Sequence, residues 1–178
     1  MLMNALVGFA LLAGAFVSPS SSSSSSRVDF SGTWVPDLNA HQRTREPKTP
    51  EAANLPPISL QGGGILFLPP QRISDDGSTL TFDSLSEDGR VISSKRLSTS
   101  GKDETTPIAG STLSRTSRST REGRSLKTQW RQTGADASAA STGTETWTLS
   151  NDNSSLTHTT SSEDANWRNQ TKTTYKRK

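Results

Sequence analysis

Phe30-Ser31-Gly32-Thr33-Trp34 is the stretch of sequence that decides the fold. A Gly-x-Trp opening, followed by one short alternating segment after another, is typical of an antiparallel β-meander whose last strand returns to its first. After this opening, no segment shows a convincing helical period. We therefore expect an all-β domain, an up-and-down barrel or sandwich of about eight to ten strands.

Turn signals separate the expected strands. Asp76-Gly77 and Asp88-Gly89 predict hairpin turns, because glycine accepts the positive φ of a primed turn. Arg121-Glu122-Gly123 and Ser150-Asn151-Asp152-Asn153 divide the later segments in the same way. The expected strands are residues 30–35, 64–74, a segment around Leu80 and Phe82, a segment from Val91 to Leu97, and residues 111–120, 124–133, 143–149, 154–161 and about 167–177.

Prolines are concentrated in one segment. Seven of the nine lie between Pro36 and Pro70. Proline has no N–H to donate within a sheet, so we expect most of this segment to be irregular connection or sheet edge.

The composition predicts a thin hydrophobic core. Leu, Ile, Val and Phe number 16, 5, 5 and 5, which is about 17% of 178 residues and low for a globular chain. Ser and Thr number 30 and 23, and the β-branch of threonine suits a pleated surface. Since the net charge is only +3, we interpret the chain as one thin-cored β domain and not as a disordered protein.

The N-terminus resembles a secretion signal. Ala5–Val17 is an apolar run of 13 residues, shorter than the roughly 20 that a membrane-spanning helix needs. No Lys or Arg precedes it, so an uncleaved hydrophobic N-terminus is the alternative. We expect residues 1–19 to be a signal peptide, disordered or helical, residues 20–27 a serine-rich linker and residues 28–178 the β domain. The absence of cysteine fits an exported bacterial protein, secreted or periplasmic.

Three segments together resemble a known group of proteins. Asp29–Trp34, the hairpin Thr146–Thr157 and the terminal Thr174–Arg177 are similar to small secreted bacterial proteins of the lipocalin-like (calycin) type. The resemblance implies a barrel in which the tryptophan closes one end and a basic side chain packs over its ring. Gly32 and Trp34 match that motif, and Lys176 or Arg177 is the candidate for the cation.

Large rings recur in phase along the later strands. Alternation places each of them on the face that carries leucine and threonine neighbours, so they form the core or line a cavity. The rings of these later strands are Trp130, Trp147, Trp167 and Tyr175, and we assign the same role to Trp34 of the opening motif. Our first hypothesis is an exported, non-enzymatic β-barrel that binds a small apolar or amphipathic ligand or has a structural role in the cell envelope.

A second hypothesis rests on a basic run. Residues 90–131 hold ten basic and three acidic side chains, and basic residues recur about every third position. The run consists of Arg115, Arg118, Arg121, Arg124, Lys127 and Arg131. It predicts either a module that binds an envelope polyanion or a solvated hairpin whose charge prevents edge pairing. Only Trp130 interleaves the run, which argues against a nucleic acid as the partner.

Signals for catalysis are weak. His41 and His158 are the only histidines, and no spacing of ligands indicates a metal site. The chain has no Gly-x-Ser-x-Gly motif and no phosphate-binding glycine loop. Carboxylates brought together only by the fold are the remaining catalytic alternative. We expect no enzyme, no catalytic residue, no cofactor, no metal and no transmembrane span, and we expect a monomer.

Overall fold

The computed structural model describes residues 27–54, 68–108, 110–134 and 140–178. Within them the chain is all-β, with ten strands and one helical turn. The strands are β1 (Gly32–Pro47), β2 (Gln71–Asp75), β3 (Thr79–Leu85), β4 (Val91–Ser98), β5 (Glu104–Pro107), β6 (Ser114–Glu122), β7 (Ser125–Thr133), β8 (Ser141–Leu149), β9 (Ser155–Glu163) and β10 (Trp167–Arg177). The expected signal peptide, residues 1–19, and most of the expected linker, residues 20–27, lie outside the described residues.

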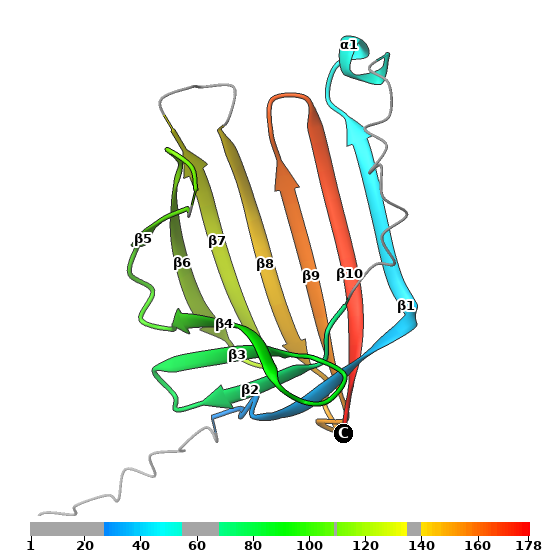
Figure 1. The fold of residues 1–178 in the computed structure, drawn as a ribbon, viewed down its shortest axis with the longest axis vertical. Helices are drawn as coiled ribbons and strands as arrows, with labels where there is room; N and C mark the ends of the chain where they lie inside the picture. The colour runs from blue at the N-terminus through cyan, green and yellow to red at the C-terminus, as the bar shows by residue number, and fades with distance from the viewer. Residues whose placement is uncertain (1–26, 55–67, 109, 135–139) are drawn as a thin grey trace, which may run out of the picture.

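The ten strands form one antiparallel sheet in the order β4-β3-β2-β1-β10-β9-β8-β7-β6-β5. The last strand pairs with the first, with Trp34 opposite Arg177, and β4 and β5 are the two edges. The sheet curls into a half-barrel (Figure 1). The prediction of an all-β, up-and-down meander of about eight to ten strands is confirmed.

Most strands lie where alternation predicts them. β10 has the expected bounds, and β7 and β9 each begin one residue after the expected start. Gly89 and Gly123 have φ values of 82° and 58°, so their turns require the conformational freedom of glycine. The short strand β5 has no counterpart in the sequence pattern.

The first part of the proline-rich segment is a strand with an open edge, one of the two arrangements expected for it, and not an irregular connection. β1 continues to Pro47, with a shift of register between Asp37 and Gln42. From Gln42 to Pro47 it pairs with β10 alone among the described residues, so its other side is an edge, where proline is tolerated. Residues 55–67 of the proline-rich segment lie outside the described residues.

One helical turn, α1 (Pro50–Ala53), forms where we expected no helix. The Thr49 hydroxyl accepts a hydrogen bond from the Ala52 N–H at 3.1 Å. Pro50 occupies the first position, where a missing N–H breaks no helical bond. Capping therefore explains why this helical turn forms although the sequence has no apolar pattern of helical period here. No described helix has the length and apolarity to cross a membrane.

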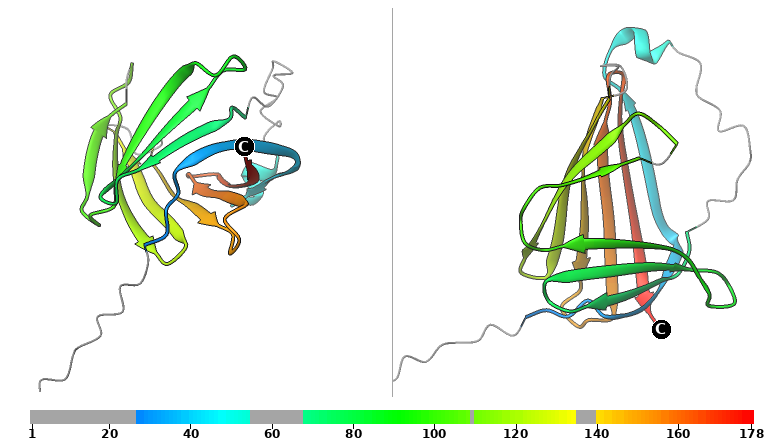
Figure 2. Two further views of the ribbon diagram at one scale, coloured as in Figure 1. Left: turned by 90° about the horizontal axis from the view of Figure 1, so that it is seen from below. Right: turned by 60° about the vertical axis from the view of Figure 1, so that its left-hand side comes forward.

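The hydrophobic core lies at one end of the half-barrel. There β2, β3 and β4 run across the long strands β6–β10, and Figure 2 shows this arrangement from two further sides. We call this the covered end, and we call the part of the long strands that β2–β4 do not reach the far end. The core consists of Phe30, Trp34, Ile73, Leu80, Phe82, Leu97, Leu126, Trp147, Leu149, Leu156 and Tyr175.

Candidate functional site

A pocket of about 390 Å³ lies on the inner face of the half-barrel, between β2–β4 and strands β8–β10. Its floor consists of aromatic core residues, and polar side chains surround them. We call it the concave pocket. It is lined by Gln71, Phe82, Ser84, Ser93, Ser94, Lys95, Glu145, Trp147, His158 and Tyr175.

Strand alternation places the polar centre of this pocket. Glu145 and Trp147 are two residues apart on β8, so their side chains share the inner face. His158 on β9 stands directly opposite Trp147 in the ladder. The two rings are stacked, with centroids 3.8 Å apart and planes 11° from parallel. The hairpin therefore presents a carboxylate and two stacked rings as one unit.

Three donors from three side chains contact the Glu145 carboxylate. Oε1 lies 3.0 Å from Trp147 Nε1 and 3.0 Å from His158 Nε2, while Lys95 Nζ forms an ion pair with Oε2. Burial alone would raise the pKa of Glu145, but the hydrogen bond from His158 and the charge of Lys95 outweigh it. The pKa therefore lies well below its ordinary value, and the group stays ionised.

Lys95 joins the two walls of the half-barrel. It lies on the edge strand β4, whereas Glu145 lies on β8, so their ion pair crosses the interior. About half of the Lys95 side chain is exposed (49%), whereas the Glu145 side chain is largely buried (13%). The cation consequently stands at the boundary between the pocket and solvent.

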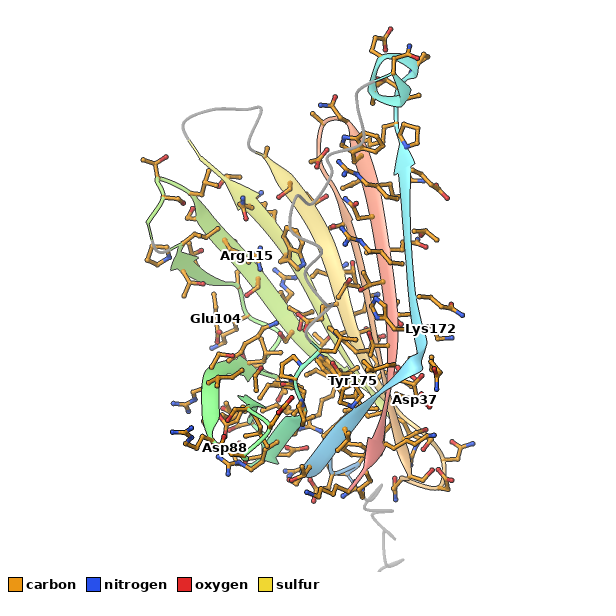
Figure 3. The ribbon with its side chains drawn as sticks, turned by 45° about the vertical axis from the view of Figure 1, so that its right-hand side comes forward. Asp37, Asp88, Glu104, Arg115, Lys172 and Tyr175 are labelled. Carbon is orange, nitrogen blue, oxygen red and sulfur yellow. The ribbon has the colours of Figure 1, made fainter. Side chains whose placement is uncertain are left out.

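Aromatic packing makes the floor. The centroid of Trp147 lies 4.9 Å from that of Phe82 and 5.7 Å from that of Tyr175. Burial and the nearby charge of Glu145 raise the pKa of Tyr175 to about 12, so its phenol is protonated at neutral pH. In Figure 3, Tyr175 lies in the crowded part of the molecule where β2–β4 meet the long strands.

These protonation states favour binding over proton transfer. A general acid or base works best with a pKa near the working pH. Glu145 has its pKa displaced far below that range and Tyr175 far above it. Among the described residues, no three His, Cys, Asp or Glu side chains are placed to hold a metal ion.

The five rings singled out from the sequence occupy three places. Trp34 is fully buried at the covered end, and Trp147 and Tyr175 form the floor of the concave pocket. Trp130 and Trp167 are half-buried towards the far end. There the guanidinium of Arg115 lies 4.4 Å from the Trp130 ring centroid, and that of Arg45 lies 3.9 Å from the Trp167 ring centroid.

The residues of the opening motif lie together. The guanidinium carbon of Arg177 lies 4.4 Å from the Trp34 ring centroid. Gly32 has a φ of 144°, and a Cβ there would stand 2.8 Å from Arg177 Nη1, so glycine leaves room for the guanidinium. The other candidate cation, Lys176, instead forms an ion pair with Asp37 at 3.0 Å.

The basic run is divided among several environments. Arg118 pairs with Asp103, Arg121 pairs with Asp75, and Arg124 donates to the carbonyl oxygens of Leu149 and Ser150. Alternation along β7 directs Lys127 and Arg131 away from the inner face that holds Leu126 and Trp130, whereas Arg115 lies on that inner face. Binding of a polyanion by the run stays a prediction.

The charged centre of the pocket was not predicted from the sequence. Glu145 stands two residues before Trp147 on an expected strand, and a carboxylate in phase with a core ring is the signal that was available. Lys95 had no local signal, because its partner is 50 positions away. The second histidine, His41, lies close by, with Nδ1 2.9 Å from the Thr173 hydroxyl.

Comparison with known proteins finds similarity among solved structures only. No protein-family model matches the chain, and no curated protein matches it. Among solved structures, the chain is similar to the crystal structure of zebrafish ileal bile acid-binding protein complexed with cholic acid. The sequences are 16% identical, the match covers 84% of this chain and 98% of the other, and the TM-score is 0.49.

Proposed function

We propose that this protein is a non-enzymatic binding protein that holds a small amphipathic molecule in the concave pocket. The pocket itself carries the proposal. Its volume of about 390 Å³ falls within the range of small-molecule sites, and such sites combine apolar walls with a few convergent polar groups. The Phe82, Trp147 and Tyr175 rings supply the apolar surface.

The charges favour an anionic head group on the ligand. Both oxygens of Glu145 already accept hydrogen bonds or an ion pair within the protein. Lys95 has three N–H donors and is half exposed, so its ammonium has capacity for a second anion. Ser84 and Ser93 add hydroxyl groups to the same inner face. The expected ligand lays an apolar body on Trp147 and directs a carboxylate or sulfonate towards Lys95.

The same groups argue against an enzyme. The low pKa of Glu145 makes it a weak base, and the high pKa of Tyr175 makes its phenol a weak acid at neutral pH. The other titratable side chains that line the pocket are Lys95, which is paired with Glu145, and His158, whose ring is stacked on Trp147 and bound to Glu145. We therefore propose binding without chemical conversion.

We also propose that the protein is exported by bacteria of the kind that the lipocalin-like resemblance implies. The apolar run Ala5–Val17 and the following serine tract support this proposal. Mass spectrometry of the protein recovered from periplasm or medium would test it. A mature N-terminus between residues 14 and 27 is the expected result, and an intact Met1 on cytoplasmic protein would contradict export.

Anilinonaphthalene sulfonate (ANS) is a suitable probe, because it combines fused rings with a sulfonate. We expect it to bind the full-length protein with its rings on Trp147. Ser93→Phe should fill the pocket, since residue 93 lies on the inner face of β4 opposite Ser84. Ser98→Phe is the matched control, because Ser98 lies on the same strand outside the pocket.

Calorimetric titration should show ANS affinity at least about tenfold weaker for Ser93→Phe and nearly unchanged for Ser98→Phe. Lys95→Met should weaken binding of ANS more than binding of an uncharged naphthalene. Equal ANS affinity in the wild type and Ser93→Phe would contradict the proposal.

A further inference from the structure

A second pocket lies outside the concave one, beside the turns at the covered end. Its volume is about 470 Å³. Residues far apart in sequence supply its polar groups: Arg27, Asp29, Arg124, Asn153 and Arg177. The β6–β7 turn, the β8–β9 turn and the chain terminus all reach this end of the molecule (Figure 1). We call it the arginine pocket.

The arginine pocket has an excess of positive charge. Three guanidinium groups and one carboxylate line it, which leaves a net charge of +2. Hydrogen bonds from Ser31 lower the pKa of Asp29, and its carboxylate is therefore ionised. The net charge of +2 includes this negative charge. Arg27 also lies 3.6 Å from Asp75, an acid that Arg121 binds as well. Arg27 and Arg121 therefore share the single negative charge of Asp75, so Asp75 does not remove the excess positive charge of the pocket.

Two of the arginines are held by neutral acceptors. Arg124 donates to the Leu149 and Ser150 carbonyl oxygens and to the Asn153 side chain. Arg177 donates to the Asn153 carbonyl at 3.0 Å and to the Ser31 carbonyl at 2.8 Å. Within the described part of the chain, no carboxylate forms an ion pair with either guanidinium. Arg118 and Arg121, in the same basic run, each have one.

This arrangement prepares a site for an anion. The carbonyl bonds fix the planes of both guanidiniums without neutralising them, so little side-chain freedom is lost when a ligand binds. The hydrogen bonds of each guanidinium use Nε and one terminal nitrogen, which leaves Arg124 Nη1 and Arg177 Nη2 without a partner among the described residues. Arginine forks match the oxygens of phosphate and carboxylate groups.

We propose that the arginine pocket binds a doubly charged oxyanion, a phosphate group, either free or as a phosphate monoester. A dianion matches the net charge of +2, and a single carboxylate does not. The pocket is larger than an inorganic phosphate needs, so it has room for the group that a monoester carries. Of the six basic residues in the run 115–131, this site uses only Arg124. It is independent of the concave pocket and of ligand binding there.

The most selective variant is Asn153→Asp. Asn153 has a φ of 58°, a conformation that aspartate also tolerates, so the turn should keep its shape. The new carboxylate would accept from Arg124 as the amide does and would neutralise it. Asn151→Asp is the matched control, because it adds the same charge to the same turn outside the pocket.

Titrations with inorganic phosphate and with phenyl phosphate, at ionic strength held constant with chloride, test the proposal. We expect saturable binding by calorimetry, and tighter binding of phenyl phosphate identifies a monoester site. Asn153→Asp should weaken phosphate binding at least about tenfold, since it removes a charge-assisted contact. Asn151→Asp should change it less than about twofold.

Backbone NMR of the wild type provides a test that needs no variant. Phosphate should shift the amide signals of Arg124, Asn153 and Arg177 together and leave those of Glu145 and Trp147 unchanged. Phosphate that acts no differently from chloride would overturn the proposal, as would equal affinity in wild type and Asn153→Asp. Shifts confined to Arg115 and Arg131 would also overturn it in favour of a surface on the hairpin.

Discussion

The covered end and the far end of the half-barrel carry aromatic rings on the same inner face, yet they bury them differently. At the covered end, Phe30 and Trp34 are fully buried, and the guanidinium of Arg177 packs on the Trp34 ring. Towards the far end, Trp130 and Trp167 remain half-buried under Arg115 and Arg45. In Figure 3, Arg115 lies well above the crowded region around Tyr175.

The difference follows from the cover that β2–β4 provide. A ring on a curled sheet is excluded from water only where a second layer meets it. Trp147 meets Phe82 of β3, and the described part of the chain offers Trp130 no such partner from β2–β4. The concave pocket lies at the boundary of this cover, where rings from the core meet charged groups. Four sets of substitutions test this difference between the two ends.

Removal of Trp34 should have the largest effect. Deleting a large ring from a packed core costs about 3–5 kcal/mol, and the contact with Arg177 adds to it. Trp167→Ala should cost only about 1 kcal/mol, because that ring is partly exposed in the folded state. Urea denaturation of both variants measures the two losses. Similar losses would mean that the far end is packed as firmly as the covered end.

A buried and an exposed ion pair on the same strand give the next contrast. The Asp75 side chain has an exposed fraction of 0%, and Arg121→Met leaves it with Arg27 as its cation and the Phe30 and Gly77 N–H groups as donors. We expect a loss of about 3 kcal/mol. Arg118→Met breaks a pair whose two members are more than half exposed, and the loss of stability should be much smaller than for Arg121→Met. The comparison fails if the two substitutions destabilise the protein equally.

The charge of Glu145 should make the stability of the pocket depend on pH. Its folded-state pKa lies below the ordinary value of 4.5, so its contribution is complete above that value and is lost as the pH falls towards the folded pKa. At neutral pH, Glu145→Gln should cost about 1–3 kcal/mol, reduced by the exposure of Lys95.

Measured between about pH 7 and pH 3, the difference in unfolding free energy between wild type and Glu145→Gln should shrink with acid. The difference isolates Glu145 from the exposed aspartates, whose lowered pKa values affect both proteins alike. If the difference in unfolding free energy stays constant over this range, the fold does not stabilise the ionised form of Glu145.

Gly143 tests packing towards the far end. It stands opposite Trp130, and a Cβ there would meet the Trp130 ring at 2.5 Å and the Ser161 carbonyl at 2.6 Å. Gly143→Ala should cost about 1–2 kcal/mol, because the half-buried ring can move aside but the backbone cannot move as freely. Ser141→Ala on the same face of β8 is the control. An unaffected melting temperature would show that Trp130 does not rest on Gly143.

Local patterns predicted most of the strands. The strand from Trp167 to Arg177 could be placed from alternation, and the turns at Gly89 and Gly123 from their glycines. The continuation of β1 to Pro47 could not, because proline is compatible with a strand only at an edge, and edges depend on the order of strands in the sheet.

Local sequence patterns predicted less of the candidate site than of the strands. Alternation placed Trp147 and Tyr175 on one face, and both line the concave pocket. It could not distinguish Trp130 from Trp147, since both are in phase and only the cover by β3 separates them. The ion pair between Lys95 and Glu145 depends on curvature that brings β4 over β8, and no local pattern encodes that curvature.

The four indole N–H signals report directly on where a ligand binds, because Trp34 lies in the core, Trp147 lines the concave pocket, and Trp130 and Trp167 lie towards the far end. The Trp34 and Trp147 indoles donate to the Phe30 carbonyl at 3.1 Å and to Glu145 at 3.0 Å, whereas Trp130 and Trp167 have no such acceptor among the described residues. In a two-dimensional NMR titration with ANS, we expect a large shift of the Trp147 indole N–H signal and little change in those of Trp130 and Trp167. The buried Trp34 indole N–H should exchange slowly with solvent. Shifts of the Trp130 and Trp167 signals with the Trp147 signal unchanged would place ligand binding at the far end and contradict binding in the concave pocket.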